Sequence, residues 1–273
     1  MNEIFYYSDD NYVGEGISLG IARGILVKYD NLKIVGEGTG IGSLALKNKL
    51  LTYFPTTCKT VQLSKTQFRK TFLIDSVMLW QLNNRPSRLL TALIELLASG
   101  YMFFPGFQNY LLKTGSFLRR LFKLTPLLKK IPPVAEASFK YSVDSDEISV
   151  ECDISSLQGY LSKTYILNEL DADYFQDGIV NGENVPPPSG WNIISSVPEH
   201  NAFYCHDYFL SFLIKKIEFK GKVPYKIFWG REKTKDLSWA GFELESDCRN
   251  KKIKKIRCSY IVKLTDKGEQ VES

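Results

Sequence analysis

The two histidines of the chain are the first candidates for chemistry, because both lie in the segment "PEHNAFYCHDYF" at 198–209. An imidazole, a thiol and a carboxylate adjacent in sequence bring nucleophilic catalysis to mind. In an extended segment, however, neighbouring side chains point to opposite faces, so Cys205 and His206 cannot pair as nucleophile and base. A structural or surface role is the first interpretation of this segment. General acid–base catalysis in a pocket, by His206 or Asp207, is the alternative.

Asp75 is another candidate, because it stands in the apolar run "FLIDSVMLW". If its carboxyl group faces inward, burial should raise the pKa, and a raised pKa would suit proton transfer. The alternative is that Asp75 faces solvent, since Ile74 and Ser76 lie on the other face of the strand.

The stretch "IVGEGTGIGSLAL" at 34–46 invites comparison with a phosphate-binding loop. Its glycines do not have the spacing of a dinucleotide fingerprint, and no lysine follows them as in a Walker loop. In a strand, the alternating glycines fall on one face and leave that face bare. We expect a neighbouring element to pack there, whereas the wall of a ligand cavity and a phosphate cradle are the alternatives. The glycines concerned are Gly36, Gly38, Gly40 and Gly42.

Residues 110–124 separate into an apolar and a basic face when they are placed on a helix. The basic face contains Lys113, Arg119, Arg120 and Lys123. This pattern fits a surface helix packed on a sheet, and it also fits attachment to an anionic membrane surface. The preceding run "LLTALIELLASGYMFF" is short of the roughly 20 residues that span a bilayer. Nucleic acid is not an expected partner, because no binding motif accompanies the basic residues.

The composition bounds the compartment and the cofactors. Five cysteines without a CxxC pair argue against a disulfide framework and against a zinc site, so no metal and no cofactor are predicted. The first residues lack the pattern of a signal peptide, which predicts a cytoplasmic location, with membrane association through the basic helix left open. Aromatic residues make up 13% of the chain, and Trp229 and Trp239 are candidates to line a ligand cavity.

Closely spaced strand-like runs with turn signals predict an antiparallel β protein on both sides of a helical stretch. We expect hairpins at Asp30-Asn31, at 47–49 and near 144–146, while "KKIPPV" is a linker because two prolines end a helix. The predicted class is α+β, mainly antiparallel β in barrel or sandwich halves, with a helical insertion at about 86–131. The predicted parts are a β-rich half at 1–82, a helical hairpin and linker at 83–133, and a second β-rich half at 134–273.

Three functions are consistent with these features. The first is the binding, with or without acid–base conversion, of an apolar or lipid-like small molecule in a β-built cavity, with the basic helix at its mouth or on a membrane. The second is a noncatalytic module that recruits a protein or a membrane. The third is a nucleotide-using enzyme in which the glycine stretch binds phosphate, and it ranks last. Whether the protein is an enzyme stays open.

Overall fold

The computed structural model of the chain describes residues 4–7, 21–29, 32–33, 40–48, 50–101, 121–144, 147–157, 163–180, 183–184, 190–193, 202–205, 210–220, 225–233, 238–247 and 257–266. Strands dominate these residues, and all strand pairs formed within them are antiparallel. The elements are β1 Ile4–Tyr7, β2 Leu26–Tyr29, β3 Leu32–Lys33, β4 Ile41–Asn48, β5 Leu51–Gln62, β6 Gln67–Leu82, β7 Arg85–Ser87, α1 Arg88–Tyr101, β8 Thr125–Asp144, β9 Glu147–Asp153, a 3-10 turn at Ser155–Leu157, β10 Lys163–Leu170, β11 Asp177–Val180, β12 Glu183–Asn184, β13 Gly190–Ile193, β14 Ala202–Cys205, β15 Leu210–Lys220, β16 Tyr225–Lys233, β17 Ser238–Asp247 and β18 Arg257–Asp266.

One large sheet organises the described part of the chain. Its strands follow the order β12-β11-β14-β15-β18-β9-β8-β6-β5-β4-β10-β17-β16-β13, with β7 paired to β6, while β1, β2 and β3 form a small separate sheet. The path is open, because β12 and β13 at its two ends do not pair with each other. Strands from both sides of α1 are neighbours in the large sheet, since β4 pairs with β10 and β6 with β8.

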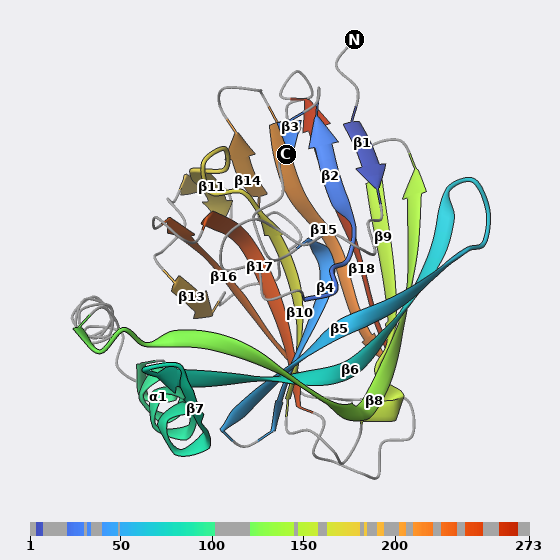
Figure 1. Ribbon diagram of the computed structural model, residues 1–273. Coiled ribbons are helices and arrows are strands. Elements are labelled where there is room, and N and C mark those ends of the chain that lie inside the picture. Colours follow the sequence, from blue (N-terminus) through green and yellow to red (C-terminus); the bar gives the residue numbers. More distant parts are fainter. Residues whose placement is uncertain are drawn as a thin grey trace.

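Long, bent strands fold this sheet into the layers of a β-sandwich. Figure 1 shows β6 and β8 rising beside β9 at one end and then sweeping across the molecule to α1 at the other. The bend coincides with a register shift after Ile74, where residues 131–134 of β8 bulge opposite Asp75. Pro132 and Pro133 fit there because a bulge releases the backbone N–H groups that a regular ladder would require.

The hydrophobic core lies between the layers. Strands β6, β8 and β9 contribute Phe72, Phe139 and Val150, and the opposing strands β4, β10 and β17 contribute Leu44, Ile166 and Phe242. Aromatic side chains meet inside this core, where Phe72 packs edge-on against Phe139 at 5.2 Å between ring centroids. Burial of these apolar side chains is the main source of stability.

The predicted α+β class with a helical insertion at about 86–131 is wrong. Within the described residues one α-helix is present, α1, and the stretch from Thr125 onward belongs to β8. The segment "KKIPPV" is therefore part of a strand and not a linker, because its backbone stays extended and pairs with β6 on both sides of the bulge. The protein is mainly an antiparallel β-sandwich.

The three predicted hairpins are confirmed. Strands β2 and β3 pair across residues 30–31, β4 and β5 pair across residues 49–50, and β8 and β9 pair with Asp144 opposite Glu147. The helix α1 begins after β7 and contacts β6 and β5. Among the described residues, no helix has the length and hydrophobicity needed to cross a membrane.

Candidate functional site

The two faces of β17 differ in chemistry. Side chains alternate along a strand, so Ala240, Phe242 and Leu244 face the core together. Glu243 and Glu245 point to the opposite face, yet both side chains are also buried. Charged side chains are buried rarely, and a buried pair on one strand needs a specific explanation.

The neighbouring strand β10 adds to this second face. Tyr165 lies opposite Glu245, and Glu169 lies opposite Gly241, two positions from Glu243 on the same face. Glu169 is buried as well. On the other side of β10, Lys163 pairs with Lys47 of β4, which brings a second lysine to the group. We call this group, completed by Glu95 of α1, the acidic face: Lys47, Glu95, Lys163, Tyr165, Glu169, Glu243 and Glu245.

Two lysines neutralise two of the glutamates. Lys163 Nζ lies 2.8 Å from Glu245 Oε1 and donates a hydrogen bond to Oε2 at 2.9 Å, so both carboxylate oxygens contact it. Lys47 Nζ lies 2.8 Å from Glu95 Oε2. Thr52 donates its hydroxyl proton to the other oxygen of Glu95 at 3.3 Å. These charge-assisted contacts hold Glu245 and Glu95 in place as carboxylates.

Glu243 has the most perturbed environment of the group. Burial raises the pKa of its carboxyl group well above the usual value, and the negative charges of Glu169 and Glu245 raise it further. The positive charges of Lys163 and Lys47 oppose this effect without cancelling it. Glu243 is therefore the side chain of this face that most readily keeps a proton.

Tyr165 is held in its neutral form by the same surroundings. Burial raises the pKa of its phenol, and the charges of Glu245 and Glu243 raise it further, as does the hydrogen bond with Glu245. Tyr165 can therefore donate a hydrogen bond but does not act as a base. The acidic face thus combines a carboxyl group with a raised pKa, two glutamates paired with lysines and a neutral phenol.

Asp75 does not belong to this group. Its Oδ1 accepts hydrogen bonds from the backbone N–H and the hydroxyl of Thr56 at 2.7 and 2.9 Å, and its Oδ2 accepts one from the Thr57 hydroxyl at 2.6 Å. Burial acts to raise the pKa of Asp75, but these hydrogen bonds outweigh it, so the pKa is lowered. The raised pKa expected from the sequence is wrong. The contacts instead clamp β5 to β6 at the bend.

The described glycines of the glycine stretch pack against the chain itself. A Cβ atom on Gly40 would lie 2.7 Å from the carbonyl oxygen of Ile25. Gly42 has a φ of 76°. Its N–H donates to the Asn168 side chain at 3.0 Å, and its carbonyl oxygen accepts the Tyr141 hydroxyl at 2.7 Å. At Gly40 a neighbouring segment fills the bare face, as we expected. Gly36 and Gly38 lie outside the described residues.

The two candidate tryptophans fall on opposite faces. Trp229 belongs to the hydrophobic core. Trp239 lies on β17 at an even spacing from Gly241 and Glu243, so its side chain is on the same face of the strand as Glu243. Both are largely buried. Trp239 is thus the one that can accompany the acidic face, together with Phe228, which pairs with Glu243.

The other sequence candidates are dispersed or outside the described residues. Lys123 is exposed in a turn before β8 and has a φ of 48°. The remaining basic residues of the predicted amphipathic helix, Lys113, Arg119 and Arg120, lie outside the described residues, as do His206 and Asp207. Within the described residues, no group of three or more His, Cys, Asp or Glu side chains is placed to hold a metal ion.

Sequence reasoning missed the glutamates of the acidic face. The segment "SWAGFELES" is typical of a strand, but its glutamates were not among the candidate residues. The signal that could have found them is that Glu243 and Glu245 alternate with Phe242 and Leu244, and Glu169 stands two residues after Leu167 in a second apolar strand. Their burial depends on the tertiary structure.

The described residues thus define an antiparallel β-sandwich with a buried acidic face. No known protein family and no curated protein matches the sequence. Among solved structures, the chain is similar to a candidate aldose 1-epimerase from Escherichia coli K12, with a TM-score of 0.40 and 9% sequence identity over 96% of this chain and 99% of the other. A likeness this distant does not indicate a function.

Proposed function

We propose that the protein is an enzyme that transfers protons to and from a small polar molecule at the acidic face. The observation that carries this proposal is the raised pKa of Glu243 beside the second buried carboxyl group of Glu169. Two carboxyl groups in one site whose proton affinities are driven apart can serve as acid and base in the same turnover.

Each residue has a role in this proposal. Glu243 holds the proton and donates it to an oxygen of the substrate. Glu169, whose charge is the largest charge effect on Glu243, is the base that accepts a proton from the substrate. After one turnover Glu243 is ionised and Glu169 protonated, and exchange with water restores the initial state.

Glu245 and Lys163 are positioning residues. Lys163 holds the Glu245 carboxylate in place at 2.8 Å, and the negative charge of Glu245 raises the pKa of Glu243 while the positive charge of Lys163 opposes that rise. Tyr165 supplies a neutral hydroxyl group on the same strand face. Glu245, Lys163 and Tyr165 do not exchange a proton in the proposed reaction.

The character of the acidic face favours a polar ligand over the apolar one expected from the sequence. Carboxylates and a phenol bind hydroxyl and carbonyl groups by hydrogen bonds, and a buried carboxylate would be costly next to an acyl chain. Trp239 and Phe228 on the same side add apolar contact for the carbon skeleton. A hydroxylated carbonyl compound fits this combination, and its isomerisation or hydration requires an acid and a base.

The first experiment needs no substrate. Carboxyl groups labelled with carbon-13 in glutamate are titrated by NMR, and the Glu243 resonance is assigned by its loss in Glu243→Gln. We expect Glu243 to titrate well above the usual value of 4.5. Titration of Glu243 near that usual value would remove the basis of the proposal.

The second experiment tests catalysis. Small hydroxylated carbonyl compounds are incubated with the protein in heavy water, and loss of C–H proton signals reports proton abstraction. Glu243→Gln and Glu169→Gln are each expected to slow exchange by about 10²–10⁴-fold. Glu136→Gln on the exposed surface of β8 is the matched control and should leave the rate unchanged. Equal rates in all four proteins would contradict the assigned roles.

A further inference from the structure

The helix α1 is turned with three of its leucines toward solvent. Leu89, Leu93 and Leu96 are 82%, 54% and 57% exposed, and their spacing places them in one stripe along the helix. Single exposed leucines are common on protein surfaces, but an aligned stripe of three on one helix is not. An ordinary surface helix has the opposite orientation, with its apolar stripe against the core.

The polar residues of α1 hold it in this orientation. The Thr91 hydroxyl is buried, accepts the backbone N–H of Trp80 at 2.8 Å and donates to the carbonyl oxygen of Ser87 at 2.8 Å. Glu95 is buried against Lys47 at 2.8 Å. Rotation of the helix to hide its leucines would break these contacts and expose a buried ion pair partner. The exposed leucine stripe is therefore built into the fold.

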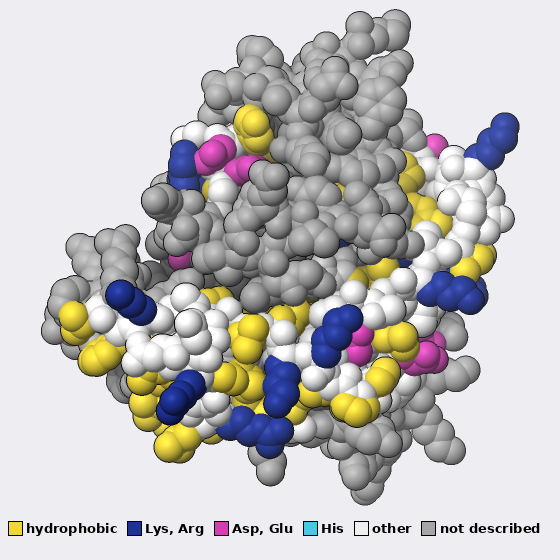
Figure 2. All heavy atoms as spheres, in the orientation of Figure 1, with side chains coloured by type: hydrophobic (Ala, Val, Ile, Leu, Met, Phe, Trp, Pro, Cys, Tyr) yellow, Lys and Arg dark blue, Asp and Glu magenta, His cyan; other side chains and the backbone are white. Residues whose placement is uncertain are grey.

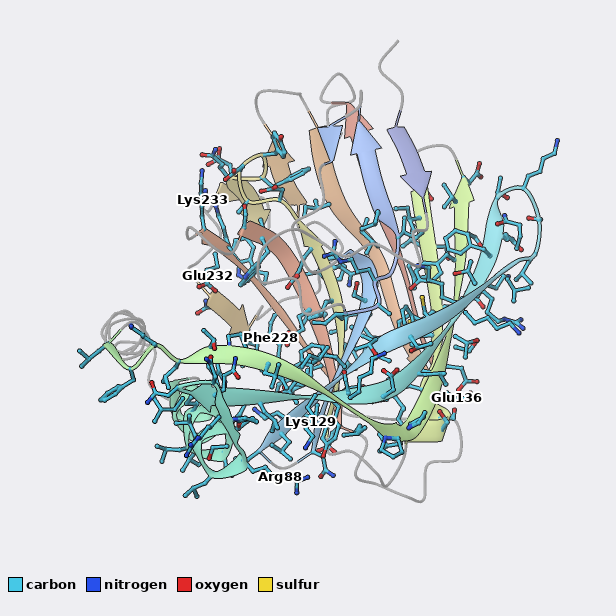
Figure 3. All side chains as sticks on the ribbon, viewed as in Figure 1. Arg88, Lys129, Glu136, Phe228, Glu232 and Lys233 are labelled. Carbon is cyan, nitrogen blue, oxygen red and sulfur yellow. The ribbon has the colours of Figure 1, made fainter. Side chains whose placement is uncertain are left out.

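The surroundings of the stripe are basic. Figure 2 shows Lys and Arg side chains among the hydrophobic ones that cover α1 and the adjoining length of β8. Figure 3 places Arg88 and Lys129 in this region, whereas Glu136 lies away from it at the bend of β8. The one acidic residue of α1 is Glu95, whose carboxylate is directed inward to Lys47. The exposed basic residues of β7, α1, the turn before β8 and the first part of β8 are Arg85, Arg88, Lys123, Lys129 and Lys130.

We infer that the leucine stripe of α1 docks on the surface of an anionic lipid bilayer. Leucine side chains enter the boundary between headgroups and acyl chains, and neighbouring Arg and Lys side chains reach anionic headgroups. Charge complementarity favours this partner, because basic residues surround the stripe and Glu95, the acid of α1, is turned inward. Leu121 and Phe122, 59% and 50% exposed, precede β8 and add apolar surface. The proposal does not depend on the function proposed for the acidic face.

Vesicle sedimentation tests this surface. The full chain is mixed with vesicles of phosphatidylcholine alone or of phosphatidylcholine with phosphatidylserine, and the bound fraction is measured at low and high salt. We expect binding to the anionic vesicles that weakens with salt. Leu89→Gln, Leu93→Gln and Leu96→Gln together should lower the partition coefficient by about tenfold or more. Arg85→Glu with Arg88→Glu should lower it by at least about fivefold.

Matched controls distinguish binding through this surface from nonspecific apolar or electrostatic binding. Val61→Gln with Leu63→Gln removes exposed apolar side chains at the end of β5, and Lys59→Glu with Lys65→Glu reverses exposed charges there. Both controls should bind like the unmodified protein. Circular dichroism and thermal unfolding verify that each variant is folded, which the exposed positions favour.

Three results would overturn the inference. One is the absence of binding to anionic vesicles by the unmodified protein. Another is equal binding by the leucine variant and the two controls. The third is a leucine stripe that mediates dimerisation in light scattering while vesicle binding is unchanged by its loss, since the occupant would then be a second copy of the chain.

Discussion

The two faces of β17 are both buried, but they differ in what their burial achieves. Ala240, Phe242 and Leu244 point to the core, while Glu243 and Glu245 point to the acidic face from the same ten-residue strand. Burial of the first set removes apolar surface from water and stabilises the fold. Burial of the second set removes charges from water, which costs stability unless ion pairs and hydrogen bonds offset it.

This difference separates the part of the sequence that maintains the fold from the part that is available for chemistry. A solvent-facing acidic face would carry no desolvation cost, so the burial of three glutamates on two adjacent strands is the feature that the proposed function explains. Burial of the apolar core between the layers offsets this cost.

The core face should show the largest effect. Phe242→Ala removes a fully buried ring next to Trp229 and Asn168 on the adjacent strands, and we expect the free energy of unfolding to fall by about 3–5 kcal/mol. Urea unfolding followed by tryptophan fluorescence measures it. A loss below about 1 kcal/mol would mean that Phe242 is not enclosed as the register requires.

The ion pair between Lys47 and Glu95 tests whether the acidic face depends on its partners. The side chains of this pair are 18% and 11% exposed. Lys47→Met should lower the free energy of unfolding by about 2 kcal/mol, because Glu95 would be left buried near other carboxylates. Replacement of both residues by Met should recover most of the loss, since no unpaired charge remains.

An exposed ion pair with the same distance between nitrogen and oxygen supplies the control. Lys233 and Asp173 also lie 2.8 Å apart, but their side chains are 53% and 52% exposed. Lys233→Met should change the free energy of unfolding by less than about 0.5 kcal/mol, because solvent screens exposed pairs. Equal losses at Lys47 and Lys233 would show that burial does not distinguish the acidic face.

The sequence predicted the strands far better than the site. Hairpins such as the one between β4 and β5 follow from local turn chemistry and alternation, so they could be anticipated. The start of β8 could not, because "TPLLKKIPPV" contains three prolines and pairs with β6 more than 40 residues earlier in the chain. Local propensity argues for a break there, and tertiary pairing overrides it.

The acidic face could not be predicted from the sequence for a related reason. Alternation in "SWAGFELES" shows that β17 has two faces, but it does not show whether the second face is covered. Glu95 reaches Lys47 across 48 positions of sequence, and Glu169 and Glu243 come together only through the β10–β17 ladder. Asp75 shows the converse, because an acid in an apolar run proved to be a well-bonded clamp with a lowered pKa.

Glu243→Gln is the most discriminating change, because its effect on stability depends on the pH. The pKa of Glu243 is higher in the folded than in the unfolded protein, so the folded state retains a proton that the unfolded state releases above pH 4.5. Stability of the unmodified protein therefore falls as the pH rises through this window. Glutamine resembles the protonated acid at every pH, so the variant should become the more stable protein, by at most about 1.4 kcal/mol for each pH unit above the unfolded value.

Thermal unfolding at about pH 4.5, 5.5 and 6.5 measures this difference, and Glu136→Gln provides the exposed control, expected within about 0.5 kcal/mol of the unmodified protein throughout. A variant that is both more stable at neutral pH and inactive would mark Glu243 as a residue kept for function at a cost in stability. A loss of stability that does not vary with pH would instead place Glu243 with the structural residues of the core face.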